Sequence, residues 1–198
     1  MKPLTRIKFA EKIKKYFKCL SVFSGLIICL NTLTAQAQTI DYSITANFIY
    51  QFTKYFSWPV TPVNVSYTAS SSSSADFVIG IIGNHELADY LQHTTISKKV
   101  GTQKIKVVEF TGAEKIYDCN ILYVSNEMSK CLKQIITQNQ TAPFLIVTEG
   151  AGLATKGSCV NLIVEDNKVK MEINLSNILR RNLKVASEFL GLGKVIQS

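Results

Sequence analysis

Four short apolar runs dominate the hydrophobic pattern of the central part of the chain. Each is five to seven residues long, and the continuously apolar run 77–83 is typical of a strand buried on both faces of a sheet. Segments with helical spacing separate the runs, and Asn84 is placed to cap one that extends to Leu91. Strands alternating with helices predict an α/β fold, with a mainly parallel sheet flanked by helices on both faces. The runs are 77–83, 104–110, 120–125 and 144–148, with a further helix expected at about 127–139.

The pattern changes period towards the C-terminus. Residues 160–164 and 169–174 alternate between apolar and polar side chains, and Asp166-Asn167 between them suits a tight turn. We therefore predict a C-terminal β-hairpin at the edge of the sheet, followed by a helix over 175–190. The inward face of this helix would consist of Leu175, Ile178, Leu179, Leu183, Ala186 and Leu190.

Residues 41–58 combine helical spacing with an unusual number of aromatic side chains, and Pro59 ends the pattern. A narrow buried stripe does not need so many aromatic residues, so we infer an interaction surface that includes Phe48, Phe52 and Trp58. Glu172 in the hairpin joins this surface, because an acid in an apolar alternating strand needs solvent or a partner. The alternative is that the aromatic residues all belong to the core.

The first 37 residues have the three parts of a secretory signal. A basic region up to Lys18 precedes an uncharged, mainly apolar run over 19–33, and Ala35-Gln36-Ala37 places small side chains where a signal peptidase reads. We expect cleavage after Ala37 and export of a soluble chain that does not span the membrane. An uncleaved anchor is the alternative, but the run is shorter than the roughly 20 residues that cross a bilayer.

Residues 38–198 are expected to form one domain with a flexible loop at about 62–75, which contains five consecutive serines. The formal net charge of the chain is +8, of which residues 1–37 carry +6. Because the remainder is close to neutral, we expect no nucleic-acid partner.

Three cysteines, Cys119, Cys131 and Cys159, lie beyond the expected cleavage site. They permit one intramolecular disulfide at most, and the odd cysteine can instead link two copies into a homodimer. We favour Cys119–Cys131, since the first opens an expected strand and the second begins the following helix. The alternatives are a disulfide between Cys159 and either of the other two cysteines, or three buried thiols without a disulfide. No Cys-x-x-Cys spacing exists and both histidines are distant in sequence, so we expect no metal site.

The sequence offers little for catalysis. Gly80-x-x-Gly83 resembles half of a nucleotide-binding turn, but the full spacing is absent and a close strand-to-helix turn explains Gly83 as well. The sequence places no nucleophile or carboxylate beside His85. We therefore predict a protein without catalytic residues or a cofactor, which works by protein contact. A second hypothesis is a small-ligand-binding module that uses the strand ends near Gly83, Asn126 and Gly150.

Several segments in this order resemble the YfiR family of exported bacterial proteins. They are the helix leading to 52–59 (FTKYFSWP), the runs 77–83 and 119–125, and the stretch 157–174 with the Leu-rich segment after it; together they cover about 40–195. The resemblance implies a periplasmic α/β domain that restrains a membrane diguanylate cyclase by binding its periplasmic sensor part. Such a protein lowers cyclic di-GMP and biofilm formation, and the partner here would be a cyclase or a sensor kinase. The best-studied family type has two intramolecular disulfides, which three cysteines cannot form, so its redox control does not transfer.

Overall fold

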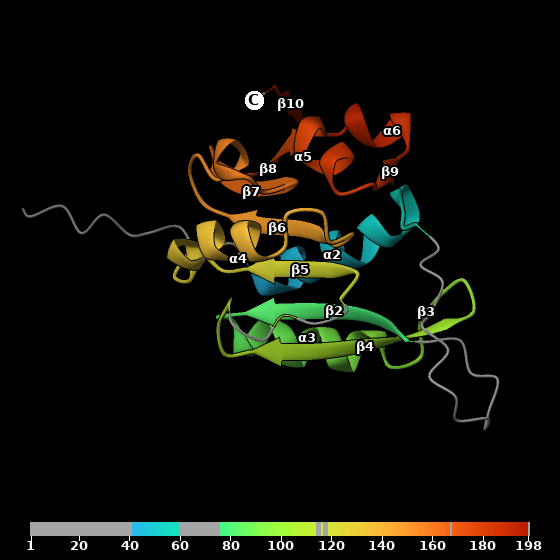
Figure 1. The fold of residues 1–198 in the computed structure, drawn as a ribbon. Helices are drawn as coiled ribbons and strands as arrows, with labels where there is room; N and C mark the ends of the chain where they lie inside the picture. The colour runs from blue at the N-terminus through green and yellow to red at the C-terminus, as the bar shows by residue number, and fades with distance from the viewer. Residues whose placement is uncertain (1–40, 60–75, 114–115, 117–118, 167, 198) are drawn as a thin grey trace, which may run out of the picture. The chain divides into compact units, whose positions relative to one another are not determined.

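An eight-stranded mixed sheet is the central element of the protein in the computed structural model (Figure 1). The structure describes residues 41–59, 76–113, 116, 119–166 and 168–197. The expected signal peptide and the expected serine-rich loop lie outside the described residues.

The four apolar runs form strands of this sheet close to their expected bounds. The strands are β2 Phe77–Ile82, β3 Lys99–Val100, β4 Gln103–Phe110, β5 Ile121–Val124, β6 Leu145–Glu149, β7 Val160–Glu165, β8 Lys168–Asn174 and β10 Lys194–Ile196. Across the sheet they follow the order β10-β8-β7-β6-β5-β2-β4-β3. Neighbours run parallel except β3 with β4 and β7 with β8. The expected α/β fold with a mainly parallel sheet is therefore confirmed.

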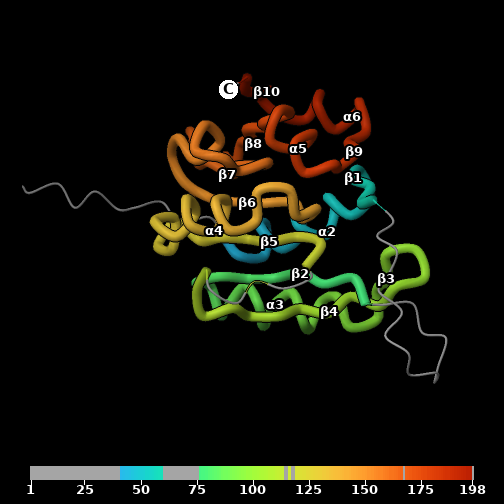
Figure 2. Tube along the Cα trace, viewed as in Figure 1, coloured from blue at the N-terminus to red at the C-terminus, as the bar shows by residue number. Residues whose placement is uncertain are grey.

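The parallel strands lie in the order β4-β2-β5-β6-β7, so the first in sequence is the second in space. From β2 the chain moves to one side through α3 (His85–Thr95), and from β5 it moves to the other side through α4 (Leu132–Gln138). Right-handed crossovers then place α3 and α4 on opposite faces of the sheet (Figures 1 and 2). The carboxyl ends of β2 and β5 flank the point where the direction reverses, which is where open α/β sheets bind ligands.

Helix α2 (Tyr42–Tyr55) packs beside α3 on the same face of the sheet. The rings of Tyr42 and Tyr90 meet edge to face, with centroids 5.6 Å apart. The Asp41 carboxylate caps α2 by accepting a hydrogen bond from the Ser43 N–H. The helix ends three residues before its expected end, because β1 (Phe56–Ser57) pairs antiparallel with β9 (Lys184–Val185).

The expected long helix over 175–190 is wrong. Helix α5 covers only Leu175–Arg180, and Asn182, with φ of 56°, turns the chain out of the helical conformation. Leu179, which was expected on the inward face, is 58% exposed. Leu183, before β9, and Phe189, in the later helix α6 (Ser187–Leu190), are buried although neither residue belongs to α5.

The chain beyond α5 adds a further strand to the sheet. After β9 and α6, β10 pairs in parallel with β8. A Cβ atom at Gly193 would lie 2.6 Å from the Met171 carbonyl oxygen, so glycine is needed for this approach. The β-hairpin is confirmed as β7–β8, but β10 rather than the hairpin forms the edge of the sheet.

Candidate functional site

Two of the aromatic residues proposed for an interaction surface, Phe48 and Phe52, lie in a cluster near the end of α2. Phe52 is 1% exposed, and its ring centroid is 6.3 Å from that of Phe56 and 5.5 Å from that of Phe189 in α6. Phe48 is partly buried and stacks on Phe52. The structure thus places Phe52 in the core, where it joins α2 to the C-terminal segment, residues 175–197. Part of Phe48 remains accessible.

Trp58 is partly buried at the amino ends of β2 and β5. Its Nε1 donates to the Asn120 carbonyl oxygen at 2.7 Å, and its ring meets Phe77 edge to face with centroids 4.8 Å apart. The Asn120 side chain in turn accepts from the Val78 N–H. These contacts close one end of the core, so Trp58 has a structural role whether or not it also contacts a partner.

Glu172 has a polar partner inside the fold. Thr148, Asn161 and Glu172 are directly opposite one another on β6, β7 and β8. The Thr148 hydroxyl donates to Asn161 Oδ1, and Asn161 Nδ2 donates to Glu172 Oε2, both at 2.8 Å. Asn161 Nδ2 also donates to the Gly150 carbonyl oxygen at 2.8 Å, which anchors the loop after β6. The acid that the sequence left without a partner therefore ends a buried polar network, and its own side chain is partly exposed.

The cysteines lie at different ends of the strands. Cys119 precedes β5 and Cys159 precedes β7, whereas Cys131 ends the 3-10 helix η2 (Ser129–Cys131) that follows β5. A strand rises about 3.3 Å per residue and a disulfide needs Cα atoms within about 7 Å, so the length of β5 opposes a Cys119–Cys131 bridge. No disulfide connects these residues within the described part of the chain. The pairing stays a prediction for peptide mapping.

Arg181, just after α5, is a buried cation that no sequence pattern indicated. It is 3% exposed, and its Nη1 donates to the carbonyl oxygens of Asn139 at 3.1 Å and Ala142 at 2.9 Å. Its guanidinium lies over the Phe144 ring, 4.6 Å from the centroid. Burial lowers the pKa of Arg181, and its charge partly offsets the burial that raises the pKa of Cys159 to about 11. Arg181 fastens the C-terminal segment to the turn between α4 and β6.

A second polar cluster lies at the switch point of the sheet. Asn84 follows β2, Tyr123 is on β5, and Glu149 ends β6. The Tyr123 hydroxyl faces both the Glu149 carboxylate and the Asn84 amide, and burial followed by the charge of Glu149 raises the Tyr123 pKa far above its usual range. Burial also raises the pKa of Glu149, although the neighbouring Tyr123 hydroxyl and Asn126 N–H act in the opposite direction.

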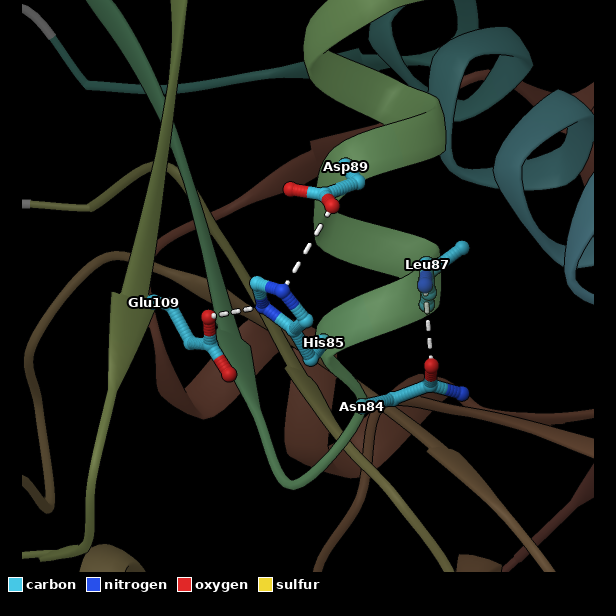
Figure 3. Close-up of polar contacts among 5 residues, drawn as sticks. All are labelled: Asn84, His85, Leu87, Asp89 and Glu109. Atoms are coloured by element: carbon cyan, nitrogen blue, oxygen red, sulfur yellow. Dashed lines mark hydrogen bonds and ion pairs between the residues drawn. The ribbon is translucent and has the colours of Figure 1, made fainter.

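The His85 ring lies between two carboxylates on the surface, from different elements (Figure 3). Nδ1 lies 2.9 Å from Glu109 Oε2 on β4, and Nε2 lies 3.5 Å from Asp89 Oδ2 one turn along α3. The neighbouring Asn84 side chain accepts from the Leu87 N–H and caps this helix, as the sequence predicted (Figure 3). The two ring nitrogens face different carboxylates, so the three side chains do not converge on one point as metal ligands would.

The part of the chain that the structure describes contains no group of three or more His, Cys, Asp and Glu side chains arranged to hold a metal ion. None of its helices has both the length and the apolar character that a membrane span requires.

A model of the YfiR/HmsC-like family matches residues 42–194, well over half of the chain. The chain belongs to this family. The match runs from α2 to the first residue of β10, which confirms the resemblance seen in the separate sequence segments. Comparison with curated proteins gives no match.

Two solved structures align with part of this YfiR/HmsC-like chain. One is an ABC domain in complex with L-Trp from Streptococcus pneumonia, and the other is a conserved domain protein from Vibrio cholerae O1 biovar El Tor. Each is 11% identical with a TM-score of 0.45, and the alignment covers 61% of this chain. The chain spans about half of their length, 55% and 54%. At this level the similarity carries no functional argument.

The sequence pointed to only part of the polar cluster in this YfiR/HmsC-like protein. Gly83, Asn126 and Gly150 were correctly identified as strand ends, and they adjoin the residues of the switch point. Tyr123 was missed because it lies inside a continuously apolar run and resembles a core residue. Glu149 was missed because a single carboxylate at the end of a strand is not part of any recognisable motif. The sequence feature that could have indicated the cluster is that polar residues follow three neighbouring strands.

Proposed function

We propose that this YfiR/HmsC-like protein is exported to the periplasm and restrains a membrane-bound diguanylate cyclase by contact with the periplasmic part of that enzyme. The family match over residues 42–194 is the observation that carries the proposal. The basic, apolar and small-residue segments of the first 37 residues support export. A protein of this kind is a regulator without catalysis of its own: it lowers cyclic di-GMP by holding the cyclase inactive.

The proposed contact includes apolar side chains of the C-terminal segment that are exposed to solvent. Leu179 on α5, Leu192 before β10 and Val195 on β10 are 58%, 57% and 41% exposed. Exposed apolar side chains bury area on association without first losing contacts in the fold. Phe48, Trp58 and Glu172 contribute only through the parts of their side chains that remain accessible.

Deletion of the gene in its own bacterium tests the proposal. We expect deletion to raise cellular cyclic di-GMP several-fold, and the wild-type gene to restore the original level. A tagged, exported protein should be crosslinked to a membrane cyclase, identified by mass spectrometry. Unchanged cyclic di-GMP after deletion would contradict the proposed function.

Leu192→Ser and Ile96→Ser form a matched pair for the contact surface. Both positions are exposed, Ile96 at 83%, but Ile96 follows α3 and lies outside the C-terminal segment. We expect both variants to melt like the wild type, Ile96→Ser to restore cyclic di-GMP control, and Leu192→Ser to lose it. If Leu192→Ser restores control fully, the surface lies elsewhere.

Two further variants, Trp58→Phe and Glu172→Gln, distinguish a contact with the partner from a structural role. Loss of partner binding with an unchanged melting temperature indicates a contact, whereas loss of binding together with a lower melting temperature indicates a structural role.

A further inference from the structure

The switch-point cluster is built from three adjacent parallel strands. Asn84 comes from the end of β2, Tyr123 from β5 and Glu149 from the end of β6. Tyr123 lies opposite Ile81 on one side and Val147 on the other, so the residue two positions after Val147, Glu149, lies on the same face as Tyr123. The strand order therefore brings a phenol and a carboxyl group together where α/β sheets hold small ligands.

The loops around this cluster are fixed in place. The Asn126 N–H faces the Glu149 carboxylate, and the Asn126 side chain lies against Gly150. A Cβ atom at Gly150 would lie 2.5 Å from Asn126 Oδ1, and φ there is +131°, so glycine alone permits this arrangement. Asn161 holds the Gly150 carbonyl oxygen from the other side. The acceptor groups are thus held in a set geometry before any ligand arrives.

The Tyr123 hydroxyl is buried and has no partner at full hydrogen-bonding geometry, although it faces both Glu149 and Asn84. A buried hydroxyl without a partner costs about 1–3 kcal/mol, so such a group calls for an explanation. An ionised Glu149 would accept from this hydroxyl more strongly than a protonated carboxyl group would, but burial disfavours the charge. A cation beside Glu149 would stabilise the ionised carboxylate and so strengthen the acceptor that faces Tyr123.

The charges around the cluster favour a cation over an anion. Glu127, in the loop after β5, adds a second negative charge near Glu149. The start of α3 disfavours an anion, because Asn84 Oδ1 already accepts from the Leu87 N–H and Glu86 adds a negative charge in the first turn. Carboxylate and phenol oxygens together match the three donors of an ammonium group.

We propose that Asn84, Tyr123, Asn126 and Glu149 form a binding site for the ammonium group of a small amine. The amine enters from the exposed side, where Asn126 is open to solvent and Glu149 is partly exposed. The site is independent of the proposed cyclase contact: it requires neither a membrane partner nor the C-terminal surface.

Ethanolamine and ethylene glycol, similar in size but different in charge, are the probes that test this site. We expect ethanolamine to shift backbone amide NMR signals near Asn84, Asn126 and Glu149 and to raise the melting temperature. Ethylene glycol at the same concentration should do neither. Glu149→Gln should weaken ethanolamine binding by about tenfold or more, because it removes the opposite charge.

Two further variants distinguish a specific binding site from a general attraction between opposite charges. Glu127→Gln removes a nearby exposed charge and should change the affinity by less than about threefold, whereas Tyr123→Phe should weaken binding without lowering the melting temperature. Equal losses in Glu127→Gln and Glu149→Gln would show diffuse attraction rather than a site. Equal effects of ethylene glycol, no effect of ethanolamine, or full affinity in Tyr123→Phe would each overturn the proposal.

Discussion

His85 links two elements through its ring, because Glu109 on β4 and Asp89 on α3 occupy its two nitrogens. The hydrogen bond to Glu109 raises the pKa of His85 most, followed by the charges of Asp89, Glu109 and Glu86. A pKa that is higher in the folded than in the unfolded chain means that the protonated ring stabilises the fold. This contribution is complete below the unfolded value of about 6.5 and disappears as the pH rises through the folded pKa.

We expect an NMR titration of His85 to give a pKa above 6.5, the ordinary value for histidine. Glu109→Gln should lower the His85 pKa, because it removes the group with the largest effect. Lys170→Gln serves as a control on a different pair, Lys170–Glu165, and should leave the His85 titration unchanged. A His85 pKa at or below 6.5 in the wild type would contradict the geometry.

At the scale of whole elements, Arg181 decides how the C-terminal segment is held. We expect Arg181→Leu to lower the free energy of unfolding by about 2 kcal/mol, since two part-buried carbonyl oxygens lose a charged donor. The adjacent Arg180 is exposed, so Arg180→Leu should change it by less than about 0.5 kcal/mol. Urea denaturation of both variants measures the difference. Equal stabilities would show that Arg181 holds nothing in place.

The sequence predicted the strands of this fold better than its C-terminal end, for a physical reason. Strands such as β5 are buried on both faces, so their apolar character is continuous and unambiguous. The last segment has apolar residues at helical spacing, but the left-handed Asn182 interrupts the helix, and asparagine is only moderately informative about that conformation. The three-residue β10 is too short to show a period of its own.

The molecule as a whole combines a sheet core that the sequence predicts and sites that depend on tertiary contacts. Asn84, Tyr123 and Glu149 are distant in sequence, and only the strand order places them together. Likewise, Glu172 looked like an unpaired acid until the register of β7 and β8 set it opposite Asn161. Strand order and register are global properties, which a local pattern of apolar and polar residues does not specify.

The different burial of the cysteines leads to a prediction about assembly in an oxidising compartment. Cys159 is fully buried with a pKa raised to about 11, whereas Cys131 is only partly buried at the start of α4. The ionised fraction of a thiol and the access of the reagent to its sulfur together control its reactivity. Iodoacetamide should therefore label Cys131 of the native protein well before Cys159. In denaturant both should react at similar rates.

Under mild oxidation we expect a covalent homodimer linked through Cys131, seen as a band of double mass on a non-reducing gel. Cys131→Ser should abolish this band and Cys159→Ser should retain it, since a buried thiol cannot reach a second copy. Non-reducing peptide mapping decides between this dimer and the intramolecular Cys119–Cys131 bridge. A monomer containing that bridge would show that β5 and η2 rearrange on oxidation. Labelling of Cys159 as fast as Cys131 would instead mean that the sheet opens at the amino end of β7.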